Sequence, residues 1–198
     1  MLPKSKIDIN NLEEIHTRIK ACNKCGLCNS CTNHVPGEGN PNADVVFIGE
    51  APGRNEDLKG KPFCGRAGQV LDELLKLADY KREDIYITNI LKCRPPKNRN
   101  PKPKEIELCT PHLIQQIKII KPRVICCLGN FAVSFIMKKF SLAAKVKPIG
   151  KIHGKIFIPP KISSLKIIPF YHPASATYNP GMIDVLKKDF QLLKNIPI

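Results

Sequence analysis

Acidic residues are scarce in this chain and are missing from a long central stretch. The sequence holds 17 Asp and Glu against 32 Lys and Arg, which gives a formal net charge of +15. No Asp or Glu lies between Leu108 and Ile183, while lysine recurs throughout that stretch. A basic surface without carboxylates favours a polyanion as partner, and nucleic acid is the leading candidate. The alternative is a compositional bias of the genome, because Lys, Ile and Asn are abundant along the whole chain.

Long apolar runs, internal repeats and low-complexity linkers are also absent. No segment approaches the roughly 20 apolar residues of a membrane span, and residues 1–20 carry charges where a secretory signal would be apolar. We therefore expect a cytoplasmic protein without membrane contact. Its 198 residues, 42% hydrophobic and 25% charged, suit one compact domain with a full core.

Nine cysteines stand out against this background. In a cytoplasmic chain they indicate metal ligands or reactive thiols rather than disulfides. Cys22 and Cys25 near the N-terminus are matched in mid-chain by Cys93 and Cys109. Four thiolates can close a zinc site or hold an iron–sulfur cluster. A shared site would tie the N-terminal segment to the middle of the chain.

Other cysteines leave a second ligand set open. Cys28 and Cys31 continue the spacing of the first pair and give a run that resembles a ferredoxin cluster motif. The resemblance is weaker at the end of the run, where the last spacing is not widened and Thr32 stands in place of proline. Cys126 and Cys127 lie in an apolar run, where we expect them to pack as small hydrophobic residues.

The hydrophobic pattern alternates between strands and helices, which predicts an α/β fold. We expect a single-domain three-layer α/β/α sandwich with a mostly parallel central sheet of about four strands. An N-terminal helix, capped by Asn10 or Asn11, and a cysteine loop would occupy residues 1–40, and the α/β core residues 41–198. A hairpin insert is expected around His153-Gly154. The strands are expected at Asp44–Gly49, Ile85–Asn89, Arg123–Leu128 and Lys166–Phe170, and the later helices at Gly65–Ala78, Pro103–Ile120, Asn130–Phe140 and Gly181–Asn195.

Polar residues occur where the predicted strands end. Glu50 follows the first strand, Asn89 ends the second, Gly129 and Asn130 follow the third, and His172 follows the fourth. Ligands of parallel α/β sheets bind beyond the carboxyl ends of the strands. We therefore expect Glu50, Asn89 and His172 to form one site rather than to be scattered capping residues.

Three motifs surround these strand ends: Gly49–Asp57 with Gly60–Phe63 and Gly65–Gly68, Thr88–Pro96 with Asn98 and Arg99, and Tyr171–Ala176. Together they resemble the signatures of the family 4 uracil-DNA glycosylases, in the same order and spacing. The resemblance implies a uracil-DNA glycosylase-like fold and an enzyme that hydrolyses the N-glycosidic bond of a flipped-out deoxyuridine. The product is an abasic site that starts base-excision repair. The implied partner is uracil-containing DNA, with a sliding clamp or another repair protein as a further candidate, and we expect a nucleoid-associated monomer.

The resemblance also implies a cofactor, a [4Fe–4S] cluster, with the ligand set Cys22, Cys25, Cys93 and Cys109. Where members of the family commonly have Arg, this chain has Cys31, so Cys28 and Cys31 stay open as substitute ligands. The expected role of the cluster is structural. It would hold the basic loop from Arg94 to Lys104 against the N-terminal segment and present both to DNA.

The chemistry of uracil removal suggests a role for each residue near the strand ends. A uracil in a duplex must be flipped out before its glycosidic bond is accessible, so Phe63 is expected to stack on the base and Asn89 to read its edge. Cytosine presents the opposite hydrogen-bonding pattern and would be rejected. His172 is expected to donate a hydrogen bond to the anion that develops at uracil O2, assisted by backbone N–H groups of Ala51 and Gly53.

The attacking water also needs an orienting group. Several other uracil glycosylase families place an Asp just after the first strand, where this chain has Ala51. Glu50 and Glu56 are therefore the candidates, with Asp57 behind them.

The expected DNA contacts lie in the basic loop and near the third motif, at Arg94, Lys97, Arg99, Ser175 and Tyr178. After Ser175-Ala176 the usual Leu-Arg of the family is replaced by Thr177-Tyr178. This replacement weakens the wedge that enters the DNA and removes a phosphate contact, and Tyr178 could stack on the DNA instead.

Short sequence motifs distinguish this enzyme from other classes of protein. A zinc base deaminase requires His-x-Glu, which no His of this chain provides, and a phosphate-binding loop would require Gly-x-x-x-x-Gly-Lys-Ser/Thr, which follows no predicted strand. A non-catalytic iron–sulfur nucleic-acid-binding protein accounts for the charge and the cysteines and is the alternative to the enzyme. It leaves Glu50, Asn89 and His172 without a role.

Overall fold

A five-stranded sheet organises the chain, of which the computed structural model describes residues 9–196. The strand order is β1-β3-β2-β4-β5; β1 pairs with β3 antiparallel, and the other neighbours are parallel. The strands are β1 (Glu38–Gly39), β2 (Val45–Gly49), β3 (Tyr86–Asn89), β4 (Val124–Leu128) and β5 (Lys166–Phe170).

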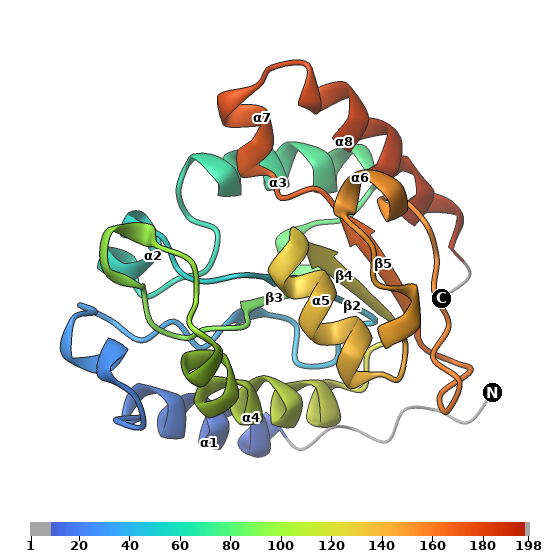
Figure 1. The fold of residues 1–198 in the computed structure, drawn as a ribbon. Helices are drawn as coiled ribbons and strands as arrows, with labels where there is room; N and C mark the ends of the chain where they lie inside the picture. Colours follow the sequence, from blue (N-terminus) through green and yellow to red (C-terminus); the bar gives the residue numbers. More distant parts are fainter. Residues whose placement is uncertain (1–8, 197–198) are drawn as a thin grey trace.

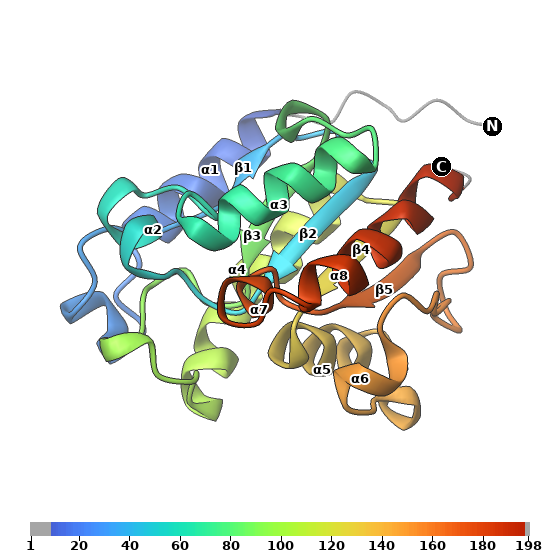
Figure 2. The same ribbon diagram turned by 90° about the horizontal axis from the view of Figure 1, so that it is seen from above.

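Helices cover both faces of the sheet and produce the expected three layers (Figures 1 and 2). α1, α4 and α5 pack on one face, and α3 and α8 pack on the other. The helices are α1 (Ile9–Lys20), α2 (Arg54–Lys59), α3 (Arg66–Leu77), α4 (Pro103–Ile120), α5 (Asn130–Lys139), α6 (Ile149–Ile152), α7 (Ala174–Tyr178) and α8 (Met182–Gln191). Short 3-10 turns are η1 (Gly26–Asn29), η2 (Arg82–Asp84), η3 (Pro96–Asn98), η4 (Ala143–Lys145) and η5 (Leu192–Asn195).

The continuous apolar runs of the strands follow from burial on two sides. In β2, Val46 and Ile48 face the layer of α1, α4 and α5, while Val45 and Phe47 face α3 and α8. Successive side chains of a strand point to opposite faces, so a strand covered on both faces is apolar at every position. Cys126 and Cys127 in β4 are fully buried, one on each face, which confirms that they pack as hydrophobic residues.

The sheet has five strands where about four were expected, because the two-residue β1 adds to the free edge of β3. One expectation about local structure was wrong. Residues 148–160 contain no hairpin: the backbone turns into α6 after Pro148, and Phe157 makes one isolated bridge to Ile167 in β5. Pro159 and Pro160 begin two residues after Phe157 and have no N–H to extend a ladder.

The helix ends differ slightly from the expected ones. α1 is described from Ile9, and Asn10 and Asn11 have helical backbone there. The last helix begins at Met182, and its final residues tighten into η5. α4 has the expected bounds, with Pro103 at the start, where its missing N–H costs nothing. No helix in the described part of the chain has both the length and the hydropathy to cross a membrane.

Candidate active site and metal centre

A cavity of about 310 Å³ lies at the carboxyl ends of the parallel strands. It brings together Glu50, Asn89 and His172, as the positions of these residues at the strand ends predicted. Asn130 lies elsewhere and accepts a hydrogen bond from the Ile149 N–H. The cavity is lined by Glu50, Ala51, Pro52, Gly53, Glu56, Phe63, Ala67, Asn89, Pro95, Asn98, Arg99, His172 and Ala174.

Asn89 has a buried side chain with an unused acceptor. The residue is 2% exposed, and its Oδ1 has no hydrogen-bond partner among the described residues. A buried polar atom without a partner is costly, so such an atom in a cavity wall suits a ligand that donates a hydrogen bond. The backbone of Asn89 is held from behind, because Lys92 Nζ donates to the main-chain carbonyl oxygen of Asn89 over 2.9 Å.

Phe63 forms an apolar wall of the cavity and is held in an unusual backbone conformation. Its φ is +48°, in the left-handed region, and Arg82 donates to its carbonyl oxygen over 2.8 Å. A Cβ at Gly68 would lie 1.8 Å from that same oxygen, so glycine is required there. The Phe63 ring stacks on His172 with centroids 5.5 Å apart and an interplanar angle of 26°.

His172 is neutral and has a defined tautomer. Burial lowers its pKa to about 4, although the Glu56 carboxylate acts in the opposite direction. The Ala174 N–H donates to His172 Nδ1 over 3.1 Å. Since Nδ1 accepts, the proton of the neutral ring is on Nε2, which is therefore a hydrogen-bond donor.

Glu56 joins two loops that form the cavity wall. Its Oε2 accepts from the Gly53 N–H over 3.1 Å, and its Oε1 accepts from the N–H groups of Cys64 and Gly65, both over 2.9 Å. Pro52 has no N–H and the Gly53 N–H is engaged by Glu56, so among residues 51–53 the Ala51 N–H, which has no partner in the described part of the chain, is available to a ligand. These contacts favour a positioning role for Glu56 over contact with water.

Glu50 is the carboxylate with free acceptors. No hydrogen bond to its side chain occurs within residues 9–196, and burial raises its pKa above the usual range. An unpaired, partly desolvated carboxylate in a cavity wall can accept a hydrogen bond from water and take its proton. Asp57 does not reach the cavity, because its Oδ1 accepts from the N–H groups of Thr32 and Asn33.

A buried lysine next to the site was missed by the sequence reasoning. Lys92 is 1% exposed, and its Nζ lies within hydrogen-bonding distance of Pro36 O, Thr88 Oγ1, Asn89 O and Gln116 Oε1. Burial lowers its pKa to about 7, and the Cys109 thiol acts in the opposite direction. Its position between Leu91 and Cys93, in a run of otherwise apolar residues, was the available signal.

The cysteines expected to bind metal gather around one small cavity. Cys22, Cys25, Cys93 and Cys109 line it, together with Cys28 and His112. Cys109 Sγ accepts the Lys92 N–H over 3.2 Å, which ties this region to the buried lysine. No three of the four expected ligand sulfurs, as described, lie within 4.8 Å of one another. Cys31 instead contacts Cys93 through a thiol hydrogen bond.

The residues expected to contact DNA differ in their freedom to do so. Lys97 is exposed, Arg94 donates to Asn98 Oδ1 over 2.7 Å, and Tyr178 is 88% exposed at the end of α7. Arg99 is less free, because its guanidinium donates to both oxygens of Glu105 over 2.6 and 2.9 Å. The Ser175 hydroxyl is buried and has no partner among the described residues.

Comparison with known proteins identifies the family. Residues 36–195 match the model of the Uracil DNA glycosylase superfamily. The type-4 uracil-DNA glycosylase of Archaeoglobus fulgidus is 46% identical over 184 residues, 92% of this chain and 92% of that protein. Those of Saccharolobus solfataricus, 46% identical over 94% of this chain and 86% of that protein, and Thermotoga maritima, 45% identical over 82% and 81%, are similar. The chain belongs to the type-4 uracil-DNA glycosylases of this superfamily.

Proposed function

We propose that this protein is a uracil-DNA glycosylase that hydrolyses the N-glycosidic bond of a flipped-out deoxyuridine and leaves an abasic site. The observation that carries the proposal is the buried Asn89 Oδ1 in the cavity wall, which has no hydrogen-bond partner within residues 9–196. Uracil presents an N3–H donor beside the O4 acceptor, which matches an amide that offers Oδ1 and Nδ2. Cytosine would place acceptor against acceptor there, so its entry would be disfavoured.

The apolar and polar walls then have separate roles. Phe63 provides the face on which the flipped base stacks. His172 donates from Nε2 to uracil O2, where negative charge develops as the bond breaks, and the Ala51 N–H supports the same oxygen. Because His172 is neutral, it stabilises the anion by a hydrogen bond and not by a full charge.

Glu50 orients the attacking water and accepts its proton. Its side chain has no competing hydrogen bond in the described chain, whereas the Glu56 carboxylate is engaged by three N–H groups. Hydrolysis therefore places the hydroxyl on the sugar carbon and the proton on Glu50, while the bonding electrons leave with uracil. Glu56 fixes the loops that carry Ala51 and Phe63.

We also propose that Cys22, Cys25, Cys93 and Cys109 hold a [4Fe–4S] cluster. Sulfurs spaced more widely than the ligands of one ion suit a cluster of several atoms. His112 lines the same cavity, and its buried Nε2 has no partner among the described residues, so it could donate to a cluster sulfide. The cluster would supply a cross-link between the N-terminal segment and the loop after β3.

DNA would approach the face that carries the loop after β3 and α7. Lys97 and Arg94 would contact phosphates, and Tyr178 would enter the space left by the flipped base. We propose that the enzyme acts in the cytoplasm at the nucleoid, as a monomer, where its net charge of +15 favours DNA association.

Release of uracil from an oligonucleotide tests the proposal. The protein is incubated with a DNA strand that carries one uracil, and alkali then cleaves any abasic site. Alkali should cleave the strand after incubation with wild type, and the rate of uracil release should fall about 100-fold or more in both Asn89→Ala and His172→Ala. Asn195→Ala, on an exposed position of η5, is the matched control and should retain full activity. DNA binding without cleavage by wild type would favour the non-catalytic alternative.

A further inference from the structure

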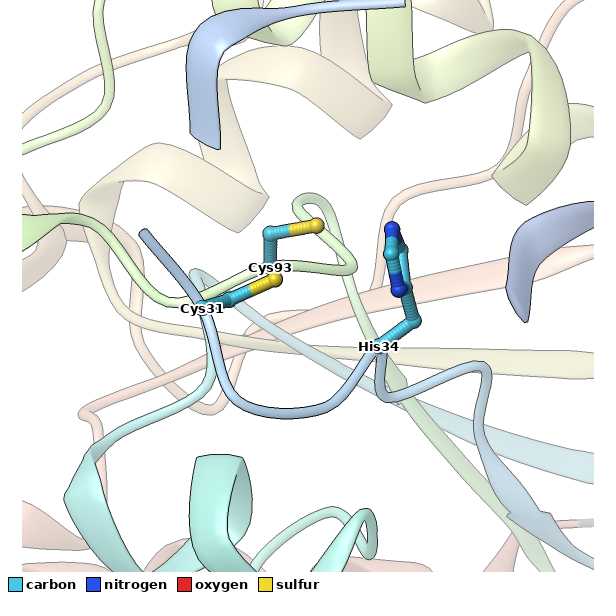
Figure 3. A group of neighbouring side chains, drawn as sticks. All are labelled: Cys31, His34 and Cys93. Carbon is cyan, nitrogen blue, oxygen red and sulfur yellow. The ribbon is translucent and has the colours of Figure 1, made fainter. Parts of the chain in front are cut away.

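Cys31, His34 and Cys93 form a compact group of metal-binding side chains that the proposed cluster does not use in full. One ligand atom from each lies within 4.8 Å of the other two, and no other such group occurs in the part of the chain described. Figure 3 shows the three side chains together, with Cys31 and His34 on the loop that leads to β1 and Cys93 on the loop after β3. We propose that these three residues form a site for a single Zn²⁺ ion.

The spacing of the three atoms fits one ion. Tetrahedral zinc with Zn–S of about 2.3 Å and Zn–N of about 2.0 Å places its ligand atoms roughly 3.6 to 3.8 Å apart. The group is within about 1 Å of that geometry, since its ligand atoms are already mutually within 4.8 Å. Two thiolates and one imidazole are a zinc ligand set that leaves the fourth position to water.

The tautomer of His34 suits a ligand. Its Nε2 lies 2.9 Å from the carbonyl oxygen of Cys22, which can only accept a hydrogen bond. The proton of the neutral ring is therefore on Nε2, and the lone pair is on Nδ1. A ring N–H that donates to a backbone carbonyl while the other nitrogen is free is the usual arrangement of a metal-binding histidine.

The loop that carries Cys31 and His34 is held in place from both ends. Asp57 Oδ1 accepts from the N–H groups of Thr32 and Asn33 over 2.8 and 3.3 Å, and Val35 N–H donates to Lys92 O over 2.7 Å. The last bond fastens the loop beside Cys93. The ligands are thus ordered by hydrogen bonds that are independent of any metal, which lowers the entropic cost of binding.

Sharing Cys93 makes the zinc site an alternative to the cluster. A thiolate that ligates iron in the cluster cannot also complete a compact site with Cys31 and His34. Zinc would therefore occupy chains that lack iron, and it would release about two protons per ion as both thiols ionise.

The test uses the full-length protein produced in iron-limited medium with added zinc. Wild type should contain about one zinc per chain, and zinc-edge X-ray absorption should give two sulfurs and at least one nitrogen. Zinc content should fall as iron is restored. Four sulfurs and no nitrogen around zinc would overturn the proposal, because that shell belongs to the four cysteines of the cluster site. This measurement needs no variant.

Paired variants give a second test. Cys31→Ser and His34→Gln should lose stoichiometric zinc, whereas Cys28→Ser is the matched control and should keep it, because the Cys28 thiol donates to Cys25 O and is outside the group. Cys22→Ser and Cys109→Ser should lose iron but keep zinc. Zinc retained by both Cys31→Ser and His34→Gln, but lost in Cys22→Ser, would contradict the proposal. These measurements of metal content do not depend on glycosylase activity. They would remain valid even if the protein did not release uracil.

Discussion

Lys92 Nζ donates a hydrogen bond over 2.9 Å to the main-chain carbonyl oxygen of Asn89, so a buried lysine supports the residue that faces the cavity. Replacing this lysine should damage the fold and the site together. Lys92→Met leaves Thr88 Oγ1, Gln116 Oε1 and two carbonyl oxygens without their shared donor. We expect the free energy of unfolding to fall by about 3 kcal/mol and uracil release to slow. Thermal unfolding measures the first effect; Lys118→Met, on an exposed face of α4, should change neither.

Gly49→Ala should disturb the base-recognition wall directly. A Cβ at Gly49 would lie 2.3 Å from Asn89 Oδ1 and 2.8 Å from the Phe63 ring, so both side chains must move. Displacements on the order of 1 Å can lower rates about 100-fold. Steady-state kinetics on a uracil-containing oligonucleotide check this, with Gly26→Ala as control because nothing lies within 4 Å of a Cβ there. An active Gly49→Ala enzyme would argue against the role of this wall.

The pH dependence of the reaction should report Glu50. Burial raises its pKa, and the role proposed here requires the ionised form, so the rate should fall as pH decreases through that raised value. His172, with a pKa of about 4, stays neutral through most of the range and contributes little. The Glu50→Gln variant should be slow at all pH values, and its rate should no longer fall as the pH decreases. If the variant keeps the same fall in rate at low pH, the titration belongs to another group.

Acid should also destabilise the protein through His16. Burial, with help from Lys92 and Lys20, lowers the pKa of His16 from its ordinary value of 6.5 to about 4. Between pH 6.5 and pH 4, His16 is therefore protonated in the unfolded chain but still neutral in the folded chain. The free energy of unfolding decreases as the pH falls through that window. Allowing for partial solvent exposure, the loss is about 2 kcal/mol. Denaturant unfolding at several pH values should show a shallower slope for His16→Gln than for wild type.

Tyr178→Ala tests the replacement of the usual Leu-Arg of the family. The side chain is 88% exposed at the end of α7, and stacking of an aromatic ring on a base is worth on the order of 1 to 3 kcal/mol. We expect about a tenfold loss on duplex DNA and a smaller loss on single strands, which need no wedge. Ile156→Ala, another exposed apolar position, is the control. Equal activity of Tyr178→Ala and wild type on duplex DNA would exclude a stacking role.

The ends of the strands could be predicted from the sequence, because the hydrophobic pattern marks each strand and the alternation of strands with helices indicates a parallel sheet. A buried strand reads as an apolar run, and parallel strands place their carboxyl ends together, so Glu50, Asn89 and His172 could be grouped before any coordinates. The two-residue β1 carried no such signal. The segment after Pro148 had strand-like isoleucines, but Pro159 and Pro160 prevented a ladder.

The contacts of individual polar groups could not be read from the sequence. Glu56 lies in the first motif like Glu50, yet only packing of the loop at Cys64 and Gly65 shows that its oxygens are occupied. Cys31 and His34 approach Cys93 because their loop is held by a hydrogen bond to Asp57. Asp57 is distant in sequence from all three residues. Such relationships arise from tertiary structure and not from local pattern.

The contacts of Glu56 limit which substitutions homologues can accept in the two loops of the cavity wall. A Cβ at Gly53 would lie 2.7 Å from Glu56 Oε2, and one at Gly65 would lie 3.3 Å from Oε1. The three residues therefore constrain one another: the carboxylate needs both glycines to reach the N–H groups, and each loop needs the carboxylate. We expect homologues to retain or replace Gly53, Glu56 and Gly65 as a set, so that the two cavity loops evolve together.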